Sequence, residues 1–127
     1  MATIRKLWSG VVTDKVAESL DFYVRYFNSE VIYEGEDLWV VVLSVGESEL
    51  GFMKPGLEFQ SSLFQAPFAG QGLWFTVDVD DVDAEYERIR ALGAPIEVSL
   101  RDEPWGDRHF SILDPNGIGV DIVQRLE

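Results

Sequence analysis

Apolar residues recur along the first half of the chain at spacings that predict one helix and several strands. Residues 4–12 form a strand-like run, and residues 16–27 carry apolar side chains three and four positions apart, which indicates one apolar helix face. Thr13 or Asp14 is expected to cap that helix, and Asn28 to end it. Three further strand-like runs follow, separated by polar turns: 30–34, 38–45 and 49–53. The predicted order is therefore β-α-β-β-β.

The same order recurs in the second half of the chain. A strand at 73–79 precedes a helix at 82–93, with Asp80 or Asp81 near the start of the helix and Gly93 at its end. Three more strands are expected at 96–100, 108–113 and 120–123. The chain thus repeats one arrangement of elements twice.

This duplication predicts two similar modules within a single domain of 127 residues. Module one spans residues 1–54, a linker without a clean period spans 55–70, and module two spans 71–127. A helix covers only one face of each sheet and leaves the other bare. We therefore expect an α+β fold in which two tandem βαβββ modules form a cupped eight-stranded mixed sheet, with the helices on its outer face.

Composition and charge narrow the range of functions. The chain has no cysteine, which excludes disulfides, zinc–thiolate sites and thiol nucleophiles and is typical of a cytoplasmic protein. A formal net charge of −13 disfavours nucleic acid as a partner and favours a cationic one. No apolar run approaches the ~20 residues that span a bilayer, so we expect no membrane partner.

The double pattern resembles the vicinal-oxygen-chelate superfamily, which includes glyoxalase I, extradiol dioxygenases, fosfomycin-resistance enzymes and bleomycin-resistance proteins. The likeness covers nearly the whole chain. Residues 73–86 and 103–117 look most like the bleomycin-resistance proteins, which are metal-free homodimers that sequester a large, cationic, aromatic drug. The residues that carry the resemblance are Val12-Thr13-Asp14, Ser19 to Tyr23, Val79 to Asp83, Glu103-Pro104-Trp105-Gly106, Arg108, Phe110 and Asp114-Pro115-Asn116-Gly117.

The resemblance also implies where a divalent metal would be held in the enzymes of this superfamily. Their histidine ligands lie on the first strand of each module, at positions that fall here on Leu7 or Trp8 and on Trp74. Their glutamate ligands lie on the last strands, at Glu49 and Asp121. An indole has no lone pair to offer, and two carboxylates suit at most weakly held magnesium or calcium. We therefore expect no metal cofactor, with a divalent metal as the alternative.

Aromatic rings and carboxylates together suit a cationic or planar aromatic small molecule. Alternation along 73–79 places Trp74 and Thr76 on the face away from the helix. Trp105 matches the tryptophan that stacks on the drug in bleomycin-resistance proteins. The expected ligand-binding residues are Trp8, Trp39, Glu49, Met53, Trp74, Thr76, Trp105, Arg108 and Asp121.

The sequence thus favours a metal-free, homodimeric protein that sequesters a drug or metabolite, similar to the bleomycin-resistance proteins. One alternative is a glyoxalase-like or dioxygenase-like enzyme, a lyase or isomerase, with Glu49 or Asp121 as its base. Another is a degenerate module that serves only for interaction. His109, the single histidine, is expected to be a satisfied polar group, and Arg108 to pair with an acidic residue.

Overall fold

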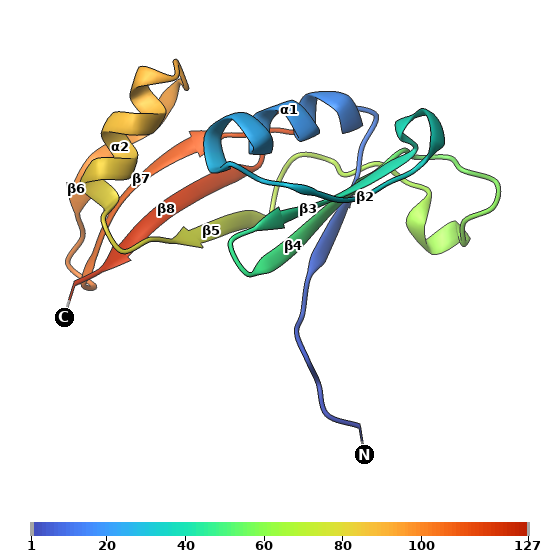
Figure 1. The fold of residues 1–127 in the computed structure, drawn as a ribbon, viewed down its shortest axis with the longest axis horizontal. Helices are drawn as coiled ribbons and strands as arrows, with labels where there is room; N and C mark the ends of the chain where they lie inside the picture. Colours follow the sequence, from blue (N-terminus) through green and yellow to red (C-terminus); the bar gives the residue numbers. More distant parts are fainter. Residues whose placement is uncertain (1, 127) are drawn as a thin grey trace. The chain divides into compact units, whose positions relative to one another are not determined.

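The chain folds into two compact units that divide between Ala69 and Gly70. The structure, a computed structural model, describes residues 2–126. Each unit contains one βαβββ module with its own mixed sheet of four strands (Figure 1). The predicted α+β fold with two tandem modules is therefore confirmed. None of the helices formed by residues 2–126 combines the length and the apolar character that crossing a bilayer requires.

The first module has the strand order β1-β4-β3-β2. Strand β1 pairs with β4 in parallel, whereas β4 with β3 and β3 with β2 are antiparallel. Two short 3-10 helices, η1 (Glu36–Leu38) and η2 (Ser62–Phe64), lie outside the sheet. The elements of the module are β1 (Ser9–Val12), α1 (Val16–Phe27), β2 (Val31–Glu34), β3 (Val40–Val45) and β4 (Ser48–Met53).

Helix α1 packs on one face of the first sheet and forms the core of that module. Tyr23 stacks on Phe52 with ring centroids 5.4 Å apart, and Val41 and Leu43 of β3 are fully buried. Because successive strand residues point to opposite faces, burial of Leu50 and Phe52 under the helix leaves Glu49, Gly51 and Met53 on the other face.

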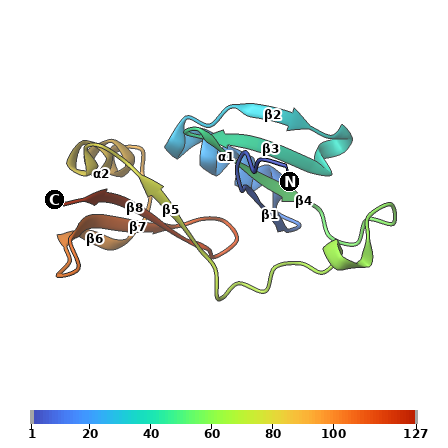
Figure 2. The same cartoon turned by 90° about the horizontal axis from the view of Figure 1, so that it is seen from below.

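The second module repeats this arrangement with the strand order β5-β8-β7-β6 (Figure 2). Strand β5 pairs with β8 in parallel, and the other two pairings are antiparallel. Helix α2 covers one face, where Tyr86 meets Phe110 with centroids 5.0 Å apart. The elements are β5 (Trp74–Asp78), α2 (Val82–Ala91), β6 (Ile96–Asp102), β7 (Asp107–Leu113) and β8 (Gly119–Arg125).

Two local predictions about the first module were wrong. The first strand begins at Ser9 rather than at residue 4, and Ile4 and Leu7 are 86% and 89% exposed. Apolar spacing alone does not make a strand where no neighbouring strand pairs with it. The N-cap position of α1 is Lys15, not Thr13 or Asp14, and the Thr13 hydroxyl instead accepts a hydrogen bond from the Lys15 amide at 3.0 Å.

Candidate functional site

The face of the second sheet opposite α2 carries polar side chains near the middle of the sheet. Phe110 and Ile112 of β7 are fully buried towards the helix, so His109 and Ser111 project from the other face. Asp121 of β8 stands beside Ser111 in the register of the two strands. We call this surface the open face of the second sheet.

His109 lies between two carboxylates on the open face of the second sheet. Its Nδ1 is 2.6 Å from Oδ1 of Asp121, and its Nε2 is 2.8 Å from Oε2 of Glu103. The Ser111 hydroxyl donates a third hydrogen bond, to Oδ1 of Asp121 at 3.0 Å. The His109 side chain is only 12% exposed. These residues form the Glu103–His109–Asp121 network.

The network favours the charged form of the histidine. Burial lowers the pKa of His109, but the hydrogen bonds to Asp121 and Glu103 outweigh it, and the net shift of the pKa is upward. The hydrogen bond from His109 in turn lowers the pKa of Glu103. In its protonated form, His109 donates from both ring nitrogens to carboxylates and has no lone pair left for a metal ion or a proton.

Two exposed tryptophans flank this network. The Trp105 indole N–H donates to Asp107 at 3.0 Å, and its ring meets that of His109 edge-on with centroids 6.5 Å apart. The Trp74 indole N–H donates to Thr76 at 2.9 Å on the edge strand β5. Trp74 and Trp105 are each 69% exposed. These hydrogen bonds fix the orientation of both indoles while leaving ring surface available to a ligand.

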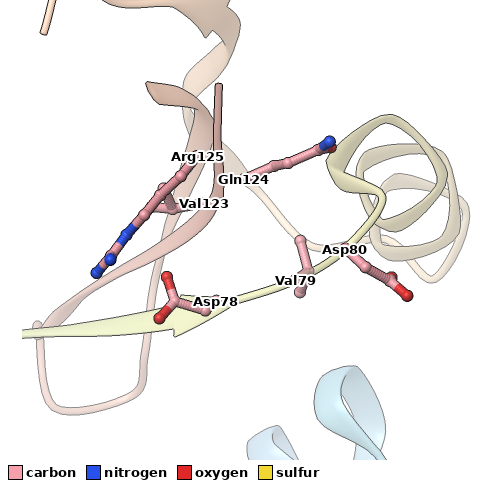
Figure 3. Close-up of a pocket in the computed structure, with 6 residues that line it drawn as sticks. All are labelled: Asp78, Val79, Asp80, Val123, Gln124 and Arg125. Carbon is pink, nitrogen blue, oxygen red and sulfur yellow. The ribbon is translucent and has the colours of Figure 1, made fainter. Parts of the chain in front are cut away.

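Space is available beside Trp74 and, separately, at the ends of β5 and β8. Gly119, the register partner of Trp74, would direct a side chain into open space, with no heavy atom within 4 Å of its Cβ. A hollow of about 320 Å³ also lies at the ends of β5 and β8 (Figure 3). Val123, the register partner of His109, is one of its walls. The others are Asp78, Val79, Asp80, Gln124 and Arg125.

The first module places three of the expected residues on the bare face of its own sheet. Trp8 rather than Leu7 lies there, with Cζ3 3.5 Å from the point that a Cβ on Gly51 would occupy. Glu49 and Met53 share that face by strand alternation. Glu49 is not free, because the Lys6 ammonium forms an ion pair with it. We call this surface the open face of the first sheet.

Trp39 and Arg108 do not join the Glu103–His109–Asp121 network. Trp39 precedes β3, where a strand residue was expected, and packs edge-on against Phe59 with centroids 5.0 Å apart. Arg108 pairs with Asp83 and Asp102, each at 2.9 Å, as the acidic composition predicts. These bonds raise the pKa of Arg108 and lower that of Asp83. Arg108 therefore joins α2 to β6.

The donor set does not fit the divalent metal that the resemblance implies. Trp74 stands at one histidine position and offers no lone pair. Glu49 is paired with Lys6, and Asp121 accepts hydrogen bonds from His109 and Ser111. Among residues 2–126, no three histidine, aspartate or glutamate side chains are grouped so as to hold a metal ion.

Sequence reasoning identified Asp121 but missed Glu103 and Ser111 as its companions. Glu103 follows β6, and the turn from Glu103 to Gly106 brings it back to Asp107 through a 2.7 Å backbone hydrogen bond. That turn directs its carboxylate to His109. The signal available in the sequence was the spacing of His109 and Ser111, two residues apart on one strand and hence on the same face.

Comparisons with known proteins agree with this architecture. Residues 7–122 match the family model of the Glyoxalase/Bleomycin resistance protein/Dioxygenase superfamily. An uncharacterized protein of Mycobacterium bovis is 27% identical over 113 residues, which cover 84% of this chain and 74% of that protein. An uncharacterized protein of Mycobacterium tuberculosis shows the same identity over the same length, and the match spans 66% of it.

Solved structures with the same fold have lower sequence identity. TioX from Micromonospora sp. ML1 has a TM-score of 0.74 at 23% identity, with 96% of this chain and 99% of TioX covered. A lactoylglutathione lyase from Agrobacterium tumefaciens has a TM-score of 0.77 at 22% identity, with 98% and 96% covered. At such identities the likeness shows the fold alone.

Proposed function

The chain belongs to the glyoxalase/bleomycin resistance protein/dioxygenase superfamily, and we propose that it is a small-molecule-binding protein that sequesters an aromatic, cationic drug or metabolite without a metal. The ligand lies on the open face of the second sheet, between Trp74 and Trp105. Thr76 and the Glu103–His109–Asp121 network form the polar surface that the ligand contacts.

The observation that carries the proposal is the pair of exposed indoles beside an anchored polar network. An indole that is 69% exposed is costly to leave in water and offers its face to a planar or cationic group. The Trp74 indole donates to Thr76 at 2.9 Å and the Trp105 indole donates to Asp107 at 3.0 Å, so both rings are oriented before a ligand binds. Such preorganisation supports binding because less side-chain freedom is lost on association.

The charge of the chain supports a cationic ligand. The formal net charge is −13, and the exposed Asp78 carboxylate lines the hollow at the ends of β5 and β8. A cation approaching this surface is attracted from a distance, and the attraction weakens as salt is added.

The same network supports binding over acid–base catalysis. A general base must be able to take a proton, and the pKa of each candidate must be near the working pH. Both ring nitrogens of His109 are within hydrogen-bond distance of carboxylates, and Asp121 is already engaged by His109 and Ser111. We therefore prefer sequestration to the lyase or isomerase alternative.

The proposal is tested with proflavine, a planar aromatic cation, and with acridone as a neutral planar analogue. Titration calorimetry should show that proflavine binds the full-length protein and that acridone binds more weakly. Trp74→Ala and Trp105→Ala should each weaken proflavine binding by roughly 2- to 30-fold, as expected for one cation–aromatic contact. Gly119→Phe should also weaken it, because the new ring fills the space beside Trp74.

Trp39→Phe is the matched control, since Trp39 packs on Phe59 within the first compact unit. It should leave the affinity for proflavine within about twofold of the original. If proflavine fails to bind, or if neither Trp74→Ala nor Trp105→Ala weakens its binding, the proposed site is wrong.

A further inference from the structure

A carboxylate of the first module is occupied by a cation from the same chain. The Lys6 ammonium forms an ion pair with Glu49 on the open face of the first sheet. Glu49 belongs to β4, which is held between β1 and β3, whereas residues 2–8 lie outside any helix or strand. The carboxylate is therefore fixed by the sheet, and the lysine that neutralises it is not.

An indole lies beside this ion pair. Trp8 approaches Gly51 to 3.5 Å, measured from its Cζ3 to the point that a Cβ would occupy. Glu49 and Gly51 are alternate residues of β4, so they share one face of the sheet. The missing side chain at Gly51 gives the indole room to rest on the sheet next to Glu49. Trp8 remains 46% exposed, which leaves ring surface free.

Lys6 and Trp8 differ in how firmly the sheet holds them. Trp8 directly precedes Ser9, whose register partner is Leu50 of β4. Lys6 lies two residues further out, and its side chain is 42% exposed against 22% for that of Glu49. A solvent cation can therefore reach Glu49 once Lys6 turns away, while Trp8 stays in place.

We propose that Glu49 and Trp8 form a site for an aromatic ammonium ligand, and that Lys6 is an intramolecular competitor for the cation position of that site. This inference rests on the proposed function, since it takes the ligand to be an organic cation. The carboxylate pairs with the ammonium group, and the indole face contacts the aromatic ring or the cation. An ion pair this exposed is weak, so displacing Lys6 lowers ligand affinity only about two- to fivefold.

The test uses the full-length protein with benzylammonium, and benzyl alcohol as its neutral counterpart. Binding is followed through the indole N–H signals of the 4 tryptophans in a nitrogen–proton NMR spectrum, which separates Trp8 from the others. Lys6→Met should tighten benzylammonium binding about two- to fivefold at the Trp8 signal and leave benzyl alcohol unaffected. Glu49→Gln and Trp8→Ala should each weaken benzylammonium binding, and Lys6→Met should have no further effect in the Glu49→Gln background.

Lys54→Met is the matched control. It removes the same charge from the same module, but the Lys54 ammonium donates to the backbone oxygen of Asp37 at 3.1 Å and leaves the Lys6–Glu49 pair intact. The inference is overturned if Lys6→Met leaves benzylammonium affinity unchanged, if Lys54→Met tightens it equally, or if Trp8→Ala strengthens it. Should proflavine still depend on Trp74 and Trp105, the proposed function stands without this site. Absence of all binding overturns both.

Discussion

Both ring nitrogens of His109 lie within hydrogen-bond distance of a carboxylate, and these contacts determine which protonation state of the ring is stabilised. Its partners Glu103 and Asp121 are 2.8 and 2.6 Å away, and its pKa is raised above the ordinary value of 6.5. The expectation from sequence, a satisfied polar group, agrees with these bonds. Its partners were not predictable, because a hydrogen bond between side chains on different strands depends on register and on the shape of the turn after β6.

The network should make stability depend on pH. A pKa of His109 above 6.5 in the folded state gives stabilisation that is fully present below that pH and lost as the pH rises through the folded value. A pKa of Glu103 below 4.5 gives stabilisation that is present above that pH and lost as the pH falls through the folded value. The network therefore stabilises most between about pH 4.5 and 6.5.

We expect His109→Gln to lower the free energy of unfolding by about 1–2 kcal/mol at pH 5.5, and by clearly less at pH 9. Urea unfolding of both proteins at the two pH values measures the difference. Ser111→Ala is a useful control, because it removes a hydrogen bond to Asp121 without removing a titrating group. If His109→Gln lowers the free energy of unfolding more at pH 9 than at pH 5.5, the protonated form of His109 is not the one that stabilises the fold.

At the scale of elements, the two helices begin in different ways. The Asp81 side chain caps α2 by accepting a hydrogen bond from the Ala84 amide at 3.1 Å, as the sequence predicts. Lys15 stands at the corresponding position of α1 and makes no side-chain cap. Periodicity predicted both helices and most strands because apolar spacing reflects which face is buried. It failed at residues 4–8, where apolar side chains have no strand beside them.

The cap of α2 should contribute measurably to stability. Asp81→Ala removes the acceptor of the Ala84 amide, and we expect it to lower the free energy of unfolding by about 1 kcal/mol. The neighbouring Asp80→Ala removes the same charge without touching the cap and should cost much less. Urea unfolding of the two variants tests this, and equal effects would show that charge rather than capping is responsible.

At the scale of the whole molecule, the sequence predicted the duplication of the βαβββ arrangement, and the structure has it in both halves. The sequence could not predict the partners of Glu49 and Asp121, the two positions at which the resemblance implies metal ligands. Pairing of Glu49 with Lys6 and of Asp121 with His109 depends on tertiary contacts. Strand β2 also exposes apolar side chains at the edge of its sheet: Val31 at 46%, Ile32 at 52% and Tyr33 at 53%.

We propose that the chain forms a homodimer and that this edge contributes to it, since exposed apolar edge strands commonly mark contact surfaces. Analytical ultracentrifugation should show a dimer, and Ile32→Lys should weaken dimerisation about tenfold or more. Leu63→Lys, at a residue of the 3-10 helix η2 that is 79% exposed, is the control. A protein that sediments as a monomer at all concentrations would rule out the dimer, and an unaffected dimer would exclude this edge.

The parallel pairing of the first strand of each module with its last strand has a consequence for biosynthesis. Residues Ser9–Val12 can find their partner only when Leu50–Met53 have left the ribosome, and Trp74–Asp78 must likewise wait for Gly119–Val123. The antiparallel hairpins and helix of each half need only near neighbours and can form earlier. Translation thus leaves the opening strand of each half unpaired until the end of that half, which makes these two segments the ones that most need protection from aggregation.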